Sequence, residues 1–242
     1  MPAMTSRLSA LSVDAVEPLR LARFWAGVLG REMADDPHDV ALSPGDGTGF
    51  RIRFVPTRDR KTGRNWTHFE LTSETPEAQR RTVARALELG GEHYDVGQLP
   101  DEKHVVLADP EGNEFCVIEP GNRFLAGCGF LGALSCDGTR EVGHFWSAAL
   151  GWPLVWDQNE ETAIQSPDGG PKIAWGGPPL MPKPARNRLR FDLAPPPGGD
   201  RDEEVERLLS LGATRIDSER AEPGPVAMAD PDGNEFCVLT PR

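Results

Sequence analysis

The sequence lacks the features that mark membrane proteins and nucleic-acid-binding proteins. No stretch of its 242 residues approaches the ~20 consecutive apolar residues of a transmembrane helix. Positive charge is not in excess, because 26 Lys and Arg stand against 38 Asp and Glu, which gives a formal net charge of −12. Contacts with phosphates dominate the affinity for nucleic acids. We therefore expect neither a membrane nor a nucleic acid as a partner.

Cysteine is scarce, and no pair has the CxxC spacing of zinc and redox motifs. The four cysteines are Cys116, Cys128, Cys136 and Cys237. The N-terminal segment has no apolar core of the kind found in signal peptides. These features predict a cytoplasmic protein with reduced thiols. Hydrophobic residues still make up 38% of the chain, which is enough for a packed core.

An internal repeat organises the chain. Residues 109–117 recur as residues 230–238 with eight of nine positions identical, and the offset is 121 residues. At the same offset Phe24-Trp25 matches Phe145-Trp146. Collinear matches of this kind predict two homologous halves. The expected bounds are 6–120 and 129–241 for the halves and 121–128 for the linker between them.

Each half has the same expected order of elements. A short strand comes first, and apolar residues at i, i+3, i+4 and i+7 then predict a helix that ends at a glycine. These positions are Leu21, Phe24, Trp25 and Val28 before Gly30, and Val142, Phe145, Trp146 and Ala149 before Gly151. Further strands are expected within 50–55, 67–71, 172–175 and 189–193.

A second helix is expected in each half. In the first half it begins after Thr75 with Pro at its first position, which is typical of a helix N-terminus. Its expected buried stripes are Val83, Ala86 and Leu87 in the first half and Val205, Leu208 and Leu209 in the second. The repeated Asp-Pro-x-Gly segment predicts a turn between two closing strands, with Glu114 and Glu235 facing outward. Because the helices need a sheet to cover, the fold class is α+β.

These motifs together resemble the vicinal oxygen chelate superfamily. The resemblance lies in Phe-Trp-x-x-x-Leu-Gly, His-Phe-Glu-Leu and Asp-Pro-x-Gly-Asn-Glu-Phe, and it is greatest to the glyoxalase-like group of the glyoxalase, bleomycin-resistance and dioxygenase clan. It implies four βαβββ modules that form two tandem glyoxalase-like half-barrel domains around a cavity. Modules can pair between halves in this family, and the sequence leaves that pairing open. Members bind metals, antibiotics or neither, so the resemblance implies a fold more than an activity.

The positions at which metal-dependent members hold their ion are altered here. The resemblance places Leu8 and Leu131 at the first ligand position, and leucine cannot ligate a metal. The second position holds His68 in one half and Arg190 in the other, and the third holds Cys116 and Cys237. His68 and Cys116 could ligate zinc, but two ligands fall short of a catalytic site. We expect no metal and no other cofactor.

Seven residues are candidates for ligand binding. The resemblance places His68 in the cavity, where it could act as a general base or a hydrogen-bond anchor, or fill a polar niche. Arg190 could clamp an anionic group or form a salt bridge within the barrel. The other candidates are Trp66 and Trp175 as stacking walls, His104 at the rim, and Cys116 and Cys237.

Two basic connectors stand out in an acidic chain. They contain Arg58, Arg60, Lys61 and Arg64 in the first half and Lys183, Arg186 and Arg188 in the second. Either they are solvated loops or they form a rim that attracts an anionic ligand.

The function expected from these features is binding of a small planar or anionic organic molecule in a half-barrel cavity, without a metal. One alternative is a lyase, isomerase or hydrolase that uses His68 as its base. Another is a metal-dependent enzyme with an atypical site. Whether the chain is an enzyme stays open, and we expect a monomer or a homodimer.

Overall fold

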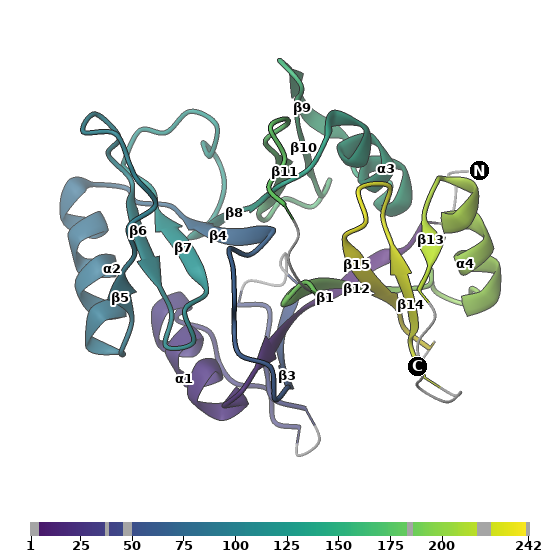
Figure 1. The fold of residues 1–242 in the computed structure, drawn as a ribbon, viewed down its shortest axis with the longest axis horizontal. Coiled ribbons are helices and arrows are strands. Elements are labelled where there is room, and N and C mark those ends of the chain that lie inside the picture. Colours follow the sequence, from purple (N-terminus) through teal and green to yellow (C-terminus); the bar gives the residue numbers. More distant parts are fainter. Residues whose placement is uncertain (1–4, 37–38, 46–49, 183–185, 217–223, 241–242) are drawn as a thin grey trace.

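The computed structural model of the protein describes residues 5–36, 39–45, 50–182, 186–216 and 224–240. Within these residues the chain forms four helices and two mixed β-sheets (Figure 1). The helices are α1 (Pro18–Leu29), α2 (Pro76–Glu88), α3 (Arg140–Leu150) and α4 (Arg201–Ser210). None of the described helices is long and apolar enough to cross a membrane. The predicted α+β class is confirmed.

The two sheets differ in their number of strands. Sheet A has seven strands in the order β13-β14-β15-β12-β1-β3-β2, and sheet B has eight in the order β5-β6-β7-β4-β8-β11-β10-β9. Sheet A contains β1 (Arg7–Ala15), β2 (Ala41–Leu42), β3 (Arg51–Pro56), β12 (Leu189–Ala194), β13 (Thr214–Arg215), β14 (Val226–Ala229) and β15 (Glu235–Val238). Sheet B contains β4 (Thr67–Leu71), β5 (Glu92–His93), β6 (Val105–Ala108), β7 (Glu114–Val117), β8 (Leu131–Cys136), β9 (Leu154–Gln158), β10 (Glu161–Gln165) and β11 (Lys172–Trp175).

Each sheet combines one module from each half of the sequence. In sheet A, β1 of the first module pairs antiparallel with β12 of the fourth, with Leu11 opposite Phe191. In sheet B, β4 of the second module pairs antiparallel with β8 of the third, with Phe69 opposite Leu134. Pairing of this kind covers strand edges that each module would otherwise expose. The pairing that the sequence left open is therefore first with fourth and second with third.

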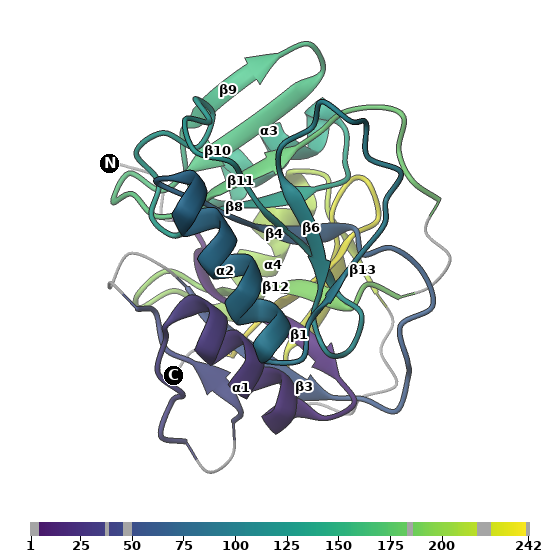
Figure 2. The ribbon, with the colours of Figure 1, turned by 90° about the vertical axis from the view of Figure 1, so that its left-hand side faces the viewer.

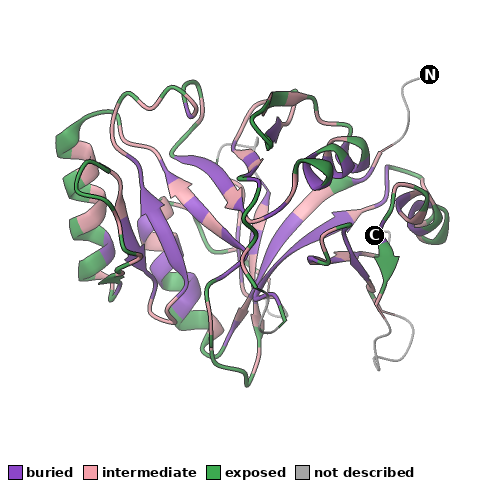
Figure 3. Ribbon diagram, turned by 45° about the horizontal axis from the view of Figure 1, so that its top comes forward, coloured by how far each residue is buried: buried purple, intermediate pink, exposed green. Residues whose placement is uncertain are grey.

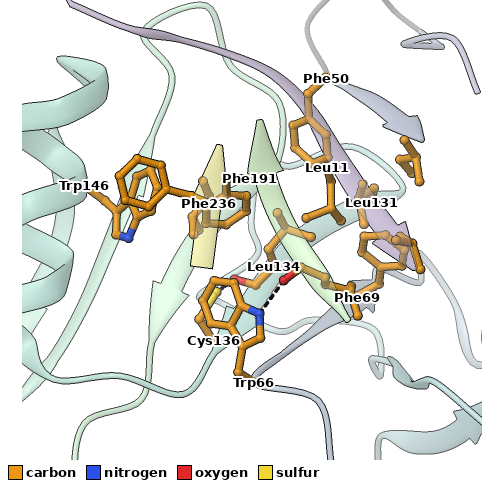
Figure 4. Packing of buried hydrophobic residues seen from close by; sticks show 14 of the residues in the cluster. Leu11, Phe50, Trp66, Phe69, Leu131, Leu134, Cys136, Trp146, Phe191 and Phe236 are labelled. Carbon is orange, nitrogen blue, oxygen red and sulfur yellow. Dashed lines mark hydrogen bonds between the residues drawn. The ribbon is translucent and has the colours of Figure 1, made fainter. Parts of the chain in front are cut away.

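The aromatic packing around the first helix of each half, by contrast, stays within that half, and Trp66 with Phe191, 5.5 Å apart between ring centroids, joins the halves. Trp25 of α1 lies 4.7 Å from Phe69 and 5.0 Å from Phe115, measured between ring centroids. Trp146 of α3 repeats these contacts with Phe191 at 5.0 Å and Phe236 at 5.1 Å. The two sets belong to one continuous hydrophobic cluster, part of which is drawn in Figure 4. Helices α1 and α3 thus join the two sheets, because each packs against both.

Most local predictions are confirmed. The stripes of α1 and α3 are buried, and Gly30 and Gly151 end these helices with φ of 64° and 68°. The Thr75 hydroxyl accepts a hydrogen bond from the Ala78 amide at the start of α2. Leu87, however, is 37% exposed, so its place in the buried stripe of α2 was wrong. Ala86 is the buried residue of α2, and Leu87 lies about 100° further round the helix. In Figure 3 the helix at the left edge is mostly exposed or intermediate, whereas the strands beside it are mostly buried.

The prediction that Glu114 faces outward was also wrong. Glu114 is 8% exposed, accepts a hydrogen bond from the Asn65 amide, and forms a 2.9 Å ion pair with Lys61. A buried carboxylate needs such partners. Alternation along a strand predicted its face correctly but could not show that the connector covers that face. Glu235, at the equivalent position, is half-buried and pairs with Arg186 at 3.0 Å.

Candidate functional site

Strand β4 carries two polar side chains on the face of sheet B that is turned away from the helices. Thr67, Phe69 and Leu71 are buried, and Phe69 packs against Trp25 of α1. Because side chains alternate along a strand, His68 and Glu70 point to the opposite face. We call this the helix-free face of sheet B. In register, Ser135 of β8 lies opposite His68, and Cys116 of β7 lies opposite Glu70.

Burial shifts the titration of both groups. It lowers the pKa of His68, an effect that Glu114 partly offsets and His104 reinforces. It raises the pKa of Glu70 to about 6, with a further contribution from the charge of Glu119. Within the described part of the chain neither His68 nor Glu70 has a hydrogen bond or an ion pair through its side chain. A neutral imidazole therefore lies next to a carboxyl group that titrates near neutral pH.

The donor chemistry of this face does not fit the metal site of metal-dependent family members. Burial, together with Glu70 and Glu114, raises the pKa of the Cys116 thiol to about 12, so the thiol stays protonated at neutral pH. Only the thiolate is an effective metal ligand or nucleophile. Leu131 is 5% exposed and belongs to the hydrophobic core. No group of three His, Cys, Asp or Glu side chains in the described residues is placed to hold an ion.

An apolar cluster covers the rest of the helix-free face of sheet B. It consists of Val106, Cys116, Ile118, Leu125 and Ala133, with Tyr94, Val96 and Phe124 packed against it. Phe124 and Leu125 belong to the linker, so the linker lies on the sheet instead of hanging free. The Lys172 ammonium donates to the Phe124 carbonyl and lies 4.6 Å from the centre of its ring. His68 and Glu70 thus border an apolar surface.

On the equivalent face of sheet A, the polar side chains of β12 form ion pairs with side chains of β1 and β3. Arg190 and Asp192 of β12 occupy the places that His68 and Glu70 occupy in β4. Arg190 pairs with Asp14 at 2.8 Å, which is the salt-bridge alternative for this residue. Asp192 pairs with Arg53 at 3.1 Å and accepts a 2.5 Å hydrogen bond from the Ser12 hydroxyl. The charges of these groups neutralise one another, although the buried Nε atom of Arg190 has no acceptor among the described residues.

The remaining candidates are dispersed. Cys237 lies beside Asp192 in sheet A, and burial raises the pKa of its thiol. Trp175 is 1% exposed and packs on Gly143 of α3, so it does not line the helix-free face of sheet B. Trp66 is buried, and its indole N–H donates to the Leu189 carbonyl at 2.6 Å (Figure 4). His104 is half-buried and near enough to His68 to affect its pKa.

Sequence reasoning brought His68, His104 and Cys116 to one face but missed Glu70. The signal was present, because Glu70 follows His68 by two residues in a segment predicted to be a strand, and such residues share a face. Arg190 and Cys237, proposed for the same site, lie on the other sheet. Their separation follows from the pairing of modules, which the sequence alone did not decide.

Comparison with known proteins identifies the family. The model of the glyoxalase-like domain family matches residues 10–118 and 133–239. Glyoxalase I from Zea mays has a similar structure, with a TM-score of 0.65, 14% identity, and coverage of 98% of this chain and 92% of that one. A variant of the same enzyme gives a TM-score of 0.66 at 15% identity, with the same coverage of both chains.

A glyoxalase/bleomycin resistance protein/dioxygenase family enzyme from Burkholderia phytofirmans is 19% identical over 46% of this chain and 96% of its own, with a TM-score of 0.39. No curated protein sequence matches the chain. The structural likenesses show the fold alone, whereas the family model covers most of both halves. The chain therefore belongs to the glyoxalase-like domain family and carries two copies of that domain.

Proposed function

We propose that the protein binds a small planar organic molecule on the helix-free face of sheet B, without a metal, through His68 and Glu70. The observation that carries this proposal is the contrast between the two sheets. Arg190 and Asp192 are held in ion pairs, whereas His68 and Glu70 have no such partner in the described residues. Both side chains are half-buried, so a bound ligand would take the hydrogen bonds that water otherwise makes with them.

The chemistry of this face favours an uncharged ligand over an anion. A neutral imidazole offers one donor and one acceptor, which suits a hydroxyl or carbonyl group. The carboxylates of Glu70 and Glu119 repel negative charge. The neighbouring apolar cluster, with Tyr94 and Phe124 beside it, suits a flat hydrocarbon surface.

The test is a titration followed by NMR with 2-naphthol and with its anionic analogue naphthalene-2-sulfonate. We expect saturable binding of 2-naphthol and at least about fivefold weaker binding in His68→Gln and in Glu70→Gln, because each loses a hydrogen-bonding group. His93→Gln is the matched control, since His93 is exposed on the short edge strand β5. Equal affinity in all four proteins, or tighter binding of the sulfonate, would contradict the proposal.

A second candidate is a proton-transfer enzyme, a lyase, isomerase or hydrolase, in which His68 is the base. It is favoured by the two neighbouring groups with shifted titration, because such pairs are typical of acid–base catalysis. His68 would take a proton from the substrate while protonated Glu70 donates a hydrogen bond to the developing oxyanion. This role requires turnover that is lost in His68→Gln and that falls as pH rises through about 6, the pKa of Glu70. Turnover retained by His68→Gln would exclude it.

A further inference from the structure

The two basic connectors meet at one cavity, whose lining does not include His68 or Glu70. Residues 57–66 lead from β3 in sheet A to β4 in sheet B. In the second connector, residues 176–182 follow β11 of sheet B and residues 186–188 precede β12 of sheet A. Figure 2 shows these long crossings beside the sheets. Residues of both crossings line a cavity of about 470 Å³. Segments more than a hundred residues apart in the sequence therefore share one cavity wall.

The lining of this connector cavity is basic although the protein is acidic. Six basic and three acidic side chains face it among the described residues. The basic ones are Arg58, Arg60, Lys61, Arg64, Arg186 and Arg188, and the acidic ones are Asp14, Asp59 and Asp137. Lys183, the remaining basic residue of the second connector, lies outside the described residues. A cationic cavity in a chain of net charge −12 attracts anions locally.

Part of this positive charge is not neutralised by neighbouring acids. Arg188 pairs with Glu111 at 2.7 Å, and the Lys61 and Arg186 ion pairs with glutamates are described above. Arg58, Arg60 and Arg64 form no ion pair with any acid that the structure describes. They remain available to an anion from solution.

Hydrogen bonds hold Arg188 at the floor of the connector cavity. Arg188 is 9% exposed, and its guanidinium donates to the carbonyls of Asp59 and Asp14 at 2.9 Å and 2.7 Å. Its Nε atom is buried and has no acceptor. The buried Trp66 ring and Met181 add apolar wall. A cavity lined by guanidinium groups together with Trp66 and Met181 suits an organic molecule that carries an anionic group.

We infer that the connector cavity binds a small phosphorylated organic molecule. A guanidinium group can donate two parallel hydrogen bonds to two oxygens of one phosphate group. The charge of a phosphate monoester is near −2 at neutral pH. The volume lies within the range of small-molecule sites. This inference does not depend on His68 and Glu70, because neither lines the connector cavity.

The test is isothermal titration calorimetry with phenyl phosphate. We expect one saturable site, and affinity reduced at least about tenfold in the double variant Arg58→Ala/Arg60→Ala, because each guanidinium lost removes charge-assisted hydrogen bonds. Arg23→Ala/Arg81→Ala is the matched control. It removes the same charge from exposed positions on α1 and α2, and we expect it to change affinity less than twofold.

Three further titrations separate this inference from its rivals. Benzoate and phenol test whether a dianionic phosphate is needed, and both should bind more weakly than phenyl phosphate. His68→Gln should bind phenyl phosphate as the unmodified protein does, so that failure of the proposed function and failure of this inference can be told apart. The inference is overturned by the absence of saturable binding, by unchanged affinity in Arg58→Ala/Arg60→Ala, or by equal loss in the control.

Discussion

Single positions decide how the two related sheets differ in chemistry. β4 has His68 and Glu70 where β12 has Arg190 and Asp192, and the backbone around them is equivalent. An arginine and an aspartate at these places find partners across the sheet, whereas a histidine and a glutamate do not. The difference in unsatisfied polar chemistry therefore arises from side chains alone.

Glu70 gives a prediction for the dependence of stability on pH. Its folded-state pKa of about 6 lies above its unfolded value, so the folded state binds more protons between about pH 4.5 and 6. The free energy of unfolding should therefore fall as pH rises through this window. Glu70→Gln should remove this part of the pH dependence and be more stable at pH 7 by on the order of 1–2 kcal/mol. Urea unfolding at pH 5 and pH 7 measures it, and identical profiles for the two proteins would refute it.

Arg190 gives a second prediction, which concerns a buried pair. Arg190→Met leaves the Asp14 carboxylate without its partner, and we expect a loss of about 3 kcal/mol in the free energy of unfolding. Arg190→Met/Asp14→Leu removes both charges and should recover most of that loss. Chemical denaturation of the two variants checks this. If the double variant is no more stable than Arg190→Met, the ion pair is not the cause.

At the scale of elements, the repeated turn holds the first helix of each half. The indole N–H groups of Trp25 and Trp146 donate to Asp109 and Asp230 at 3.1 Å. Asp109 also accepts hydrogen bonds from the backbone amides of its own turn. Burial raises the pKa of Asp109 to about 6, against the effect of these hydrogen bonds. The turn is thus both a chain reversal and an anchor for a core tryptophan.

The prediction at this scale is that both tryptophans stabilise the fold equally. Trp25→Ala and Trp146→Ala should each reduce the free energy of unfolding by about 3–5 kcal/mol, because each leaves a large cavity and removes one hydrogen bond to a buried carboxyl group. Trp156, 36% exposed, supplies the control, and its replacement by alanine should cost less than about 1 kcal/mol. Denaturant unfolding of the three variants measures these costs. A cost for Trp25 or Trp146 as small as the control's would show that the helix is held by other contacts.

At the scale of the whole molecule, the halves are joined by hydrogen-bonded strands. β1 of the first half covers one edge of β12, and β4 of the first half covers one edge of β8. Either half by itself would expose the edges of its two central strands, which are templates for pairing with another chain.

We therefore expect the isolated segment 129–241 to form a dimer, in which β8 of one copy pairs with β12 of the other as β4 pairs with β8 in the full chain. Light scattering after size-exclusion chromatography measures its mass. A folded, monomeric segment would contradict this expectation. The full chain has these edges paired internally, so it should not need a second copy to fold.

Local pattern was enough to determine the halves, the helices and the turns. These features depend on residues close together in the sequence, where backbone geometry sets the preference. They are the repeated segments, the helical spacing around Trp25 and Trp146, the glycines after α1 and α3, and the alternation of β4. Only tertiary structure decided which modules share a sheet, that Trp175 packs on Gly143, and that Arg190 meets Asp14. Residues far apart in sequence make these contacts, and any of several packings would satisfy the same local pattern. The connector cavity is the clearest case, because residues of both basic connectors are needed to line it.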